Sequence, residues 1–244
     1  MIDNIKISNR FSIDYVLEYF SGEHQNVKYI RFHQIRYQYL INLIDAIIAP
    51  HKDGPIQILD IGPMHQTNLI RDSFPHVVVD TMGQDYPINK LRPHEQHIDI
   101  DLNNVEEFQA EPKKKYDILV FSEVLEHLYT RPEIVLRFLK GYMKKGGQII
   151  LQTPNGLAIH HRIKLLFGIH PYQLIKPSRR GHYREYAPYE MIQIFENVNL
   201  DIHYLKTKNY FNNDSTILNK LFVKSSRFLP PNWRDGITII GQKD

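Results

Sequence analysis

Four side chains of this sequence can converge on one chemical site. Glu123, Glu126 and His127 stand at spacing i, i+3 and i+4, which places three side chains on one face of a helix. Further along the chain, His182 offers another imidazole. Carboxylates and imidazoles together suit Mg²⁺, Mn²⁺ or Fe²⁺ better than they suit a metal that prefers thiolates. We therefore expect a divalent-cation site here or, without a metal, a base at His127 or His182 that removes a proton from a hydroxyl group.

A second group of polar residues follows the apolar runs of the chain. In an open parallel sheet, ligands bind beyond the carboxyl ends of the strands. Carboxylates there can accept hydrogen bonds from adjacent hydroxyls of a ligand, and backbone N–H groups can bind an anionic group. The alternative is that each acid caps the helix that follows it. The residues that end these runs are Asp60 with Gly62, Asp80, Asp101, and Ser122 with Glu123.

Seven short apolar runs, rich in β-branched residues, alternate with segments long enough to form helices. This alternation predicts βαβ units and an α/β fold with a parallel sheet. The fourth and fifth runs are almost continuously apolar, as in central strands covered on both faces. The runs span residues 56–61, 77–80, 98–101, 116–121, 148–152, 202–205 and 237–240.

Two helices are predicted with particular clarity. One runs from Pro132 to Lys145 and stops at the glycine pair 146–147. The other covers residues 29–48, whose apolar residues recur at helical spacing before Pro50 ends the segment. We expect residues 1–50 to form an N-terminal helical cap that makes one compact unit with a domain spanning residues 51–244.

Composition narrows the class of protein. The chain has 244 residues, a formal net charge of +3 and no cysteine, so a disulfide framework and any thiolate-bound metal are excluded. No apolar run approaches the roughly 20 residues of a membrane span, and the N-terminus lacks the apolar core of a signal peptide. We expect a soluble, cytoplasmic protein. The small charge excess disfavours a nucleic-acid partner, which needs a stripe of basic residues.

Three motifs, in their order and spacing, resemble class I S-adenosylmethionine-dependent methyltransferases over roughly residues 30–244. They are Ile58–Gly62, Tyr116–Leu128 and Lys145–Asn155. The resemblance implies a Rossmann-like three-layer sandwich around a seven-stranded, mostly parallel sheet with an antiparallel strand 7. It also implies S-adenosylmethionine as the cofactor.

The resemblance further implies where the cofactor lies. The family loop after Gly62 usually contains further glycines, whereas Pro63 stands here and removes one N–H donor. Either this loop takes a variant path beside the cofactor, or cofactor binding has weakened. The implied contacts are Asp60, Gly62 and Pro63 near the methionine moiety, Asp80 at the ribose, Asp101 and Leu102 at the adenine, and Ser122 with Glu123 along the cofactor.

The element from Glu123 to His127, followed by a distant histidine, also resembles two branches of metal-dependent O-methyltransferases. These branches act on small-RNA 3′ ends and on catechols of ubiquinone synthesis. The resemblance implies a divalent ion that holds two neighbouring hydroxyls of the acceptor; in other relatives Glu123 contacts cofactor and His127 packs. Arg184 and Tyr186 are candidates for orienting the acceptor. Alternatively, Arg184 pairs with Glu185 or Glu190 at the surface and Tyr186 belongs to the core.

The sequence thus favours an S-adenosylmethionine-dependent O-methyltransferase acting on a hydroxylated small molecule, sugar or lipid-linked precursor. An RNA 2′-O-methyltransferase remains an alternative, although the chain offers little charge to neutralise phosphates. A catalytically silent binding protein is a second alternative, suggested by the altered loop at Pro63. A nicotinamide-dependent oxidoreductase is disfavoured because G-x-G-x-x-G does not follow the first run.

Overall fold

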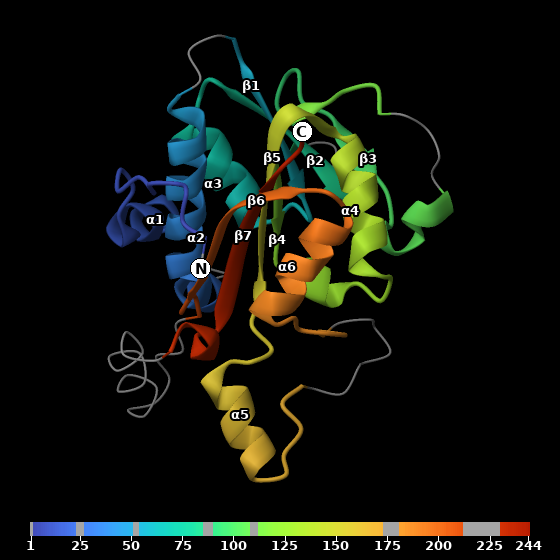
Figure 1. Ribbon diagram of the computed structural model, residues 1–244. Coiled ribbons are helices and arrows are strands. Elements are labelled where there is room, and N and C mark those ends of the chain that lie inside the picture. Colours follow the sequence, from blue (N-terminus) through green and yellow to red (C-terminus); the bar gives the residue numbers. More distant parts are fainter. Residues whose placement is uncertain are drawn as a thin grey trace.

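A seven-stranded sheet lies between two layers of helices (Figure 1). All seven apolar runs form strands, as predicted, because β-branched residues suit a pleated surface that is covered on both faces. The computed structural model describes residues 2–22, 27–50, 54–84, 90–107, 112–172, 181–211 and 230–244.

The strands and helices follow one another in the alternation that the sequence predicts. The strands are β1 (Ile56–Ile61), β2 (Val77–Gly83), β3 (His97–Asp99), β4 (Tyr116–Ser122), β5 (Met143–Pro154), β6 (Asp201–Lys208) and β7 (Gly236–Gln242). The α-helices are α1 (Ile13–Tyr19), α2 (Val27–Ile48), α3 (His65–Ser73), α4 (Pro132–Gly141), α5 (Ile159–Leu166) and α6 (Pro188–Asn197). Short 3₁₀ helices are η2 (Leu102–Glu107), η3 (Leu125–His127) and η5 (Pro231–Trp233).

The strand order is β3-β2-β1-β4-β5-β7-β6. Strand β7 runs antiparallel to both of its neighbours, and the other pairings are parallel. From β1 the chain builds outward through β2 and β3, and then returns to place β4 on the other side of β1. A crevice therefore opens at the carboxyl ends of β1 and β4, where ligands bind in sheets of this kind.

Alternate residues of each central strand face opposite hydrophobic cores. In β4, Ile118 and Val120 belong to the core beneath α1, α2 and α3, whereas Leu119 and Phe121 belong to the core beneath α4 and α6. These four side chains are at most 1 % exposed. Burial on both faces makes the central strands a rigid base for the loops that leave their carboxyl ends.

Several elements differ from the sequence prediction. Strand β3 ends at Asp99 rather than Asp101, and β5 begins at Met143 rather than Gln148. Helix α4 ends at Gly141, not Lys145, because Met143 already pairs with Tyr116 as the first residue of β5. Strand β2 continues three residues beyond Asp80 to Gly83, which pairs with β3. The residues after β4 form the 3₁₀ turn η3 rather than an α-helix.

Helix α2 is the longest described helix and carries four charged residues along its 22-residue length. It packs between α1 and α3 (Figure 1). Among the described residues, no helix combines the length and the apolar character needed to cross a membrane.

Candidate functional site

Two neighbouring cavities open at the carboxyl ends of the strands. We call the smaller one, of about 240 Å³, the strand-end cavity. It lies where the turns after β1, β2 and β3 meet the segment after β4. Its described lining consists of Gly62, Gly83, Gln84, Ile100, Asp101, Leu102, Asn103, Val124, His127, Leu128, Tyr129 and Tyr183.

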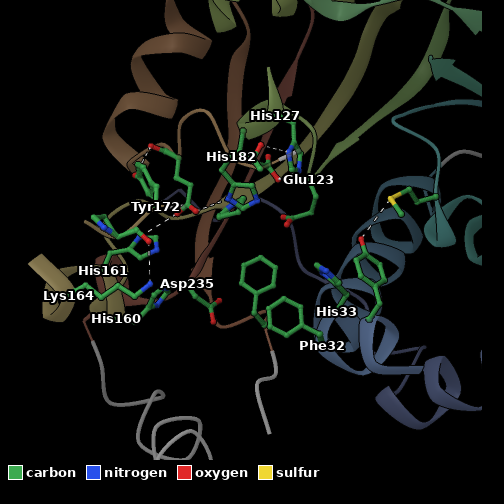
Figure 2. Close-up of a pocket in the computed structure, with 18 residues that line it drawn as sticks. Phe32, His33, Glu123, His127, His160, His161, Lys164, Tyr172, His182 and Asp235 are labelled. Atoms are coloured by element: carbon green, nitrogen blue, oxygen red, sulfur yellow. Dashed lines mark hydrogen bonds and ion pairs between the residues drawn. The ribbon is translucent and has the colours of Figure 1, made fainter. Parts of the chain in front are cut away.

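The second cavity, of about 670 Å³, is lined by five histidines and is named the histidine cavity. Figure 2 shows Phe32 and His33 on its α2 side and His160, His161 and Lys164 on the opposite, α5 side. His127 lines both cavities and stands at their junction. The other described lining residues are Tyr29, Met64, Glu123, Glu126, Pro154, Pro171, Tyr172, Gly181, His182, Glu185, Phe211 and Asp235.

Hydrogen bonds fix the tautomers of the two central histidines. The Nδ1 atom of His127 lies 2.9 Å from the carbonyl oxygen of Gly181, and Nδ1 of His182 lies 2.8 Å from a carboxylate oxygen of Glu185. Both partners only accept hydrogen bonds, so each Nδ1 carries the proton. When such a ring carries no second proton, its Nε2 atom keeps a lone pair that can accept a proton or bind a cation.

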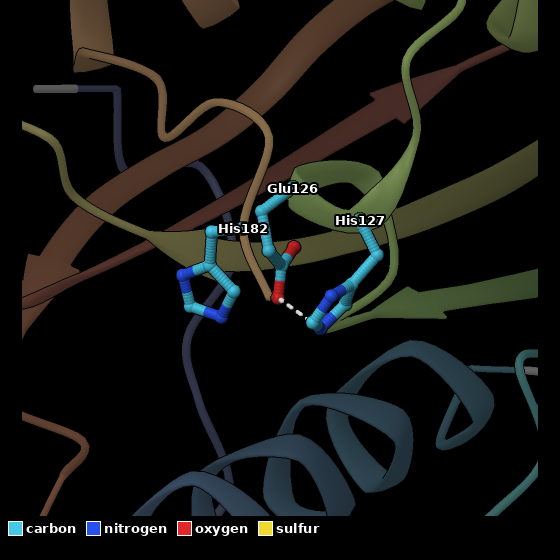
Figure 3. A group of neighbouring side chains, drawn as sticks. All are labelled: Glu126, His127 and His182. Atoms are coloured by element: carbon cyan, nitrogen blue, oxygen red, sulfur yellow. Dashed lines mark ion pairs between the residues drawn. The ribbon is translucent and has the colours of Figure 1, made fainter. Parts of the chain in front are cut away.

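Glu126, His127 and His182 form a compact cluster. Figure 3 shows the Glu126 carboxylate between the two imidazole rings, whose centroids are 4.9 Å apart. One ligand atom from each of the three residues lies within 4.8 Å of the other two. Glu123, the fourth ligand expected from sequence, does not belong to this cluster. The turn η3, rather than a shared face of an α-helix, brings Glu126 and His127 to His182.

Glu126 is fully buried and Glu123 is half-buried, and each has one carboxylate oxygen shielded from water. Burial raises the pKa of both groups, and repulsion from Glu126 raises the pKa of Glu123 further, well above its ordinary value. Atom Oε1 of each accepts no hydrogen bond from the described residues. The backbone of Glu123 has φ = 58°, a strained value for a residue with a side chain. Such strain and such unsatisfied atoms are typical of ligand sites.

Several further groups in this region were missed by the sequence analysis. Arg36, 1 % exposed, donates to His33 and to Ser122 and lowers the pKa of Asp60 and Glu123. Burial, followed by the charge of Arg36, lowers the pKa of His33 to about 2, so this imidazole is neutral. Burial raises the pKa of Asp235 to about 7. A charged residue in the apolar stripe of α2 was the available sequence signal for Arg36.

Three of the expected cofactor contacts line the strand-end cavity, namely Gly62, Asp101 and Leu102. A Cβ atom at position 62 would lie 2.3 Å from a methyl group of Val124, and φ of Gly62 is +72°. Only glycine therefore allows the turn after β1 to approach the segment after β4 this closely. Pro63 packs beside Gly83, whose added Cβ would lie 3.5 Å from the proline ring.

Asp60 and Ser122 lie behind the cavity walls instead. Asp60 is fully buried, accepts a 2.6 Å hydrogen bond from Thr67 at the start of α3, and has its pKa raised to about 6 by burial. Ser122 donates to Gln152 and accepts from Arg36. Both residues position the loops around the cavities, and neither is among the described lining residues.

The structure places Asp80 away from both cavities, which corrects its expected position beside a ribose. Its buried carboxylate accepts hydrogen bonds from Lys114 at 2.6 Å, from the Tyr116 hydroxyl at 2.8 Å and from the Gln96 backbone at 3.0 Å. The strand continues past Asp80, so Gly83 and Gln84 reach the cavity in its place.

Arg184 and Tyr186, expected to orient an acceptor, also lie outside the two cavities. Arg184 pairs with Glu190 and stacks over the ring of Tyr186. Tyr186 is 4 % exposed and belongs to the core beneath α4 and α6. These placements match the alternative reading of the two residues. Glu185, between them, turns inward to His182.

Comparisons with known proteins identify relatives of this architecture. A family model described as "Methyltransferase domain" matches residues 31–205. The "Ubiquinone biosynthesis O-methyltransferase" of Rickettsia bellii is 24 % identical over 179 residues, covering 72 % of this chain and 73 % of that protein. A "SAM dependent methyltransferase from Archaeoglobus fulgidus" has a similar fold at 18 % identity, with a TM-score of 0.52 over 85 % of this chain and 96 % of the other. The plantazolicin methyltransferase BpumL, solved in complex with a triazolic desmethylPZN analog and SAH, is 16 % identical and has a TM-score of 0.52 over 95 % of this chain and 90 % of the other.

Replacing Asp80 and Asp101 separates the structural carboxylate from the one that lines a cavity. Asp80→Ala leaves a buried tyrosine hydroxyl and a lysine without their acceptor, so we expect the free energy of unfolding to fall by about 3 kcal/mol. Asp101→Ala should cost less than about 1 kcal/mol, because it removes only local caps. Urea denaturation measures both changes.

The same two variants are titrated with S-adenosylmethionine by calorimetry. Asp101→Ala should weaken affinity about five- to tenfold through loss of a hydrogen-bond acceptor, while folded Asp80→Ala keeps affinity within about twofold. A large loss of affinity in Asp80→Ala without a loss of stability would contradict this assignment.

Proposed function

Because this chain belongs to the methyltransferase family whose model matches residues 31–205, we propose that it methylates a hydroxyl oxygen of a small organic acceptor bound in the histidine cavity. The chain is an S-adenosylmethionine-dependent methyltransferase of the class I fold. One observation carries the assignment of the two ligands. His127 lines both cavities, so a donor in one and an acceptor in the other meet at this residue.

The strand-end cavity suits the nucleoside part of the methyl donor. Gly62 opens the cavity to the backbone of the turn after β1, and Asp101 offers a carboxylate for hydroxyl or amino groups. Leu102 and Tyr129 supply apolar surface against which a base can pack. With the nucleoside placed there, the methionine end of the donor points toward the junction at His127.

The histidine cavity suits an acceptor that carries hydrogen-bond donors and a flat apolar part. Glu123 Oε1, Glu126 Oε1 and Glu185 Oε2 are buried and accept no hydrogen bonds from the described residues, so hydroxyl groups of a ligand would satisfy them. Phe32 and Phe211 stack on each other at 5.2 Å on the α2 side of the cavity. Aromatic walls of this kind favour a ring or another planar group.

Transfer requires an in-line approach of the acceptor oxygen to the methyl carbon at about 3 to 3.5 Å. The oxygen forms a bond to that carbon while the carbon–sulfur bond breaks, and the sulfonium becomes the thioether of S-adenosylhomocysteine. Without a metal, the hydroxyl proton passes to Nε2 of His182, whose Nδ1–H is held by Glu185. His127, with Nδ1–H held by Gly181, orients the hydroxyl at the junction.

The alternative to a histidine base is a divalent cation at Glu126, His127 and His182, which would occupy Nε2 of His182 in place of the proton. Two imidazoles and one carboxylate with an unsatisfied buried oxygen fit Mg²⁺, Mn²⁺ or Fe²⁺. Such an ion, when bound, would lower the pKa of an acceptor hydroxyl. Each imidazole already has an acceptor for its Nδ1–H, Gly181 for His127 and Glu185 for His182. Such hydrogen bonds raise the basicity of the Nε2 atoms that would bind the ion.

Oxygen is the proposed acceptor atom partly because the Rickettsia bellii relative is called an O-methyltransferase. The cavity supports the same choice, since its unsatisfied carboxylate oxygens select for groups that donate hydrogen bonds. A hydroxylated small molecule, including a sugar or a lipid-linked precursor, meets this requirement.

Replacing His182 tests its role as the proton acceptor. Incubating the enzyme with methyl-labelled S-adenosylmethionine and a metabolite extract should give a labelled product whose label survives alkali, as an ether does and an ester does not. We expect His182→Ala to lower the labelling rate by about 10²- to 10⁴-fold while S-adenosylmethionine affinity stays within about twofold.

His170→Ala is the matched control, because His170 also lies between α5 and α6 in the sequence, is exposed and does not line the cavity. It should label at the wild-type rate. Unchanged labelling by His182→Ala, or label on nitrogen, would contradict the proposed chemistry.

Thermal unfolding in the presence of Mn²⁺ tests the cation site without any acceptor. At a metal concentration about 100-fold above the dissociation constant, Tm should rise by on the order of 5 °C or more, and chelator should reverse the rise. Glu126→Gln and His182→Ala should each abolish the shift, whereas His170→Ala should keep it. A wild-type Tm that does not respond to Mn²⁺ or Mg²⁺ excludes the cation.

A further inference from the structure

Helix α5 projects from the body of the protein, away from both helical layers (Figure 1). It follows β5, and Pro171 and Tyr172, which come after it, line the histidine cavity. Of its eight residues, only His161 is buried. The helix is therefore held at its base and presents its far end to the surroundings.

The far end of α5 concentrates exposed apolar side chains. Within the described residues, ten large hydrophobic side chains are exposed, and five of them fall between positions 163 and 169. Scattered exposed apolar residues are ordinary, but a contiguous group marks an interaction surface. We call this group the apolar tip. It consists of Ile163 (45 % exposed), Leu165 (57 %), Leu166 (84 %), Phe167 (77 %) and Ile169 (57 %).

The sequence around the apolar tip is positively charged. No aspartate or glutamate occurs from Ile134 to Arg184. The part from Gly156 to Arg184 holds six lysines and arginines, including Arg162 and Lys164 of α5 itself. The whole chain has a net charge of +3, so the remainder carries 3 − 6 = −3. The positive charge of the protein is therefore gathered in the segment that bears the apolar tip.

We propose that the apolar tip inserts into an anionic lipid surface. A helix that binds a protein groove presents one stripe of residues at spacing i, i+3, i+4 and i+7. Ile163, Leu166 and Phe167 have the first part of this spacing, but the apolar tip is broader than one stripe. Leu165 points to another side of the helix, and Ile169 lies beyond the end of α5, so the apolar side chains surround the end of the helix. A fluid interface can surround such a tip, and lysine and arginine beside it meet the charged headgroups.

Insertion of the apolar tip would orient the histidine cavity toward the lipid surface. His160, His161 and Lys164 belong to α5 and also line the histidine cavity. The helix that enters the interface thus forms one wall of the cavity. If the proposed function holds, the acceptor is an amphiphile that enters from the lipid, and the lipid-linked option is favoured over a free sugar.

Vesicle co-sedimentation of the full chain tests the proposal independently of activity. The probes are vesicles of phosphatidylcholine alone and vesicles that also contain phosphatidylglycerol. We expect wild-type protein to bind the anionic vesicles and to be released by high salt. The double variant Leu166→Ser/Phe167→Ser should lose at least about tenfold in partitioning.

The matched control, Ile13→Ser/Tyr189→Ser, removes two exposed apolar side chains from α1 and α6 and should bind as wild type does. Neither pair of residues lines a cavity, so every variant should bind S-adenosylmethionine as wild type does. This titration shows that each variant is folded, and it tests the proposed function separately from lipid binding.

Absence of wild-type binding to anionic vesicles would overturn the proposal, and so would equal binding by the tip variant. Sedimentation velocity without lipid tests whether a second copy of the chain binds the apolar tip instead. A wild-type dimer that becomes a monomer in the tip variant would show that a second copy of the chain covers the tip, and would overturn the proposal as well.

Discussion

The structure depends on holding carboxylates out of water at the carboxyl ends of β1 and β4. Asp60 and Glu126 are fully buried, Glu123 is half-buried, and burial raises the pKa of all three. Isolated buried charges are costly, so the fold surrounds these groups with the guanidinium of Arg36 and with hydroxyl donors such as Thr67. Compensation is incomplete, since each carboxylate keeps one oxygen without a hydrogen bond from the described residues. Two of these carboxylates, Glu123 and Glu126, line the histidine cavity, where a ligand can donate hydrogen bonds to their unpaired oxygens.

This constraint explains why the site needs the whole sheet. The adjacent strands β1 and β4 bring their terminal loops together, and the contact between Gly62 and Val124 sets how closely they approach. Beyond that contact, His127 and His182 are oriented by backbone and carboxylate acceptors on the segment before α6. The two cavities therefore share a junction whose imidazole tautomers are defined before any ligand binds. Such preorganisation is what methyl transfer requires of a protein, because the reaction depends on alignment.

Much of the fold could be predicted from the sequence, because β-branched runs and their spacing encode strands directly. The ends of strands were harder to predict. Asp80 ends the apolar run, but β2 continues to Gly83 because Gly83 pairs with β3. Helix α4 was extended too far because Met143 continues its apolar spacing, yet pairing with Tyr116 draws it into β5. Tertiary contacts overrode local pattern in both cases.

The residues of the candidate site also divide into those that local sequence patterns indicate and those that depend on tertiary contacts. The sequence motifs singled out Gly62, Asp101, His127 and His182, which line the two cavities. Arg36 was missed because an arginine in a helix gives no sign that it will be buried. The placement of Asp80 and Tyr186 depended on which side of a strand or loop they face, and periodicity alone could not decide it. Glu185 was seen beside Arg184 as a surface partner, but its carboxylate turns to His182 and His161.

A crystal structure of the protein with S-adenosylhomocysteine tests the central claim most directly, namely that donor and acceptor occupy separate cavities that meet at His127. The account predicts the adenosine in the strand-end cavity, beside Asp101 and Leu102, with the sulfur directed to the junction at His127 and the histidine cavity left open. A nucleoside bound in the histidine cavity, among Glu123 and Asp235, would contradict the account.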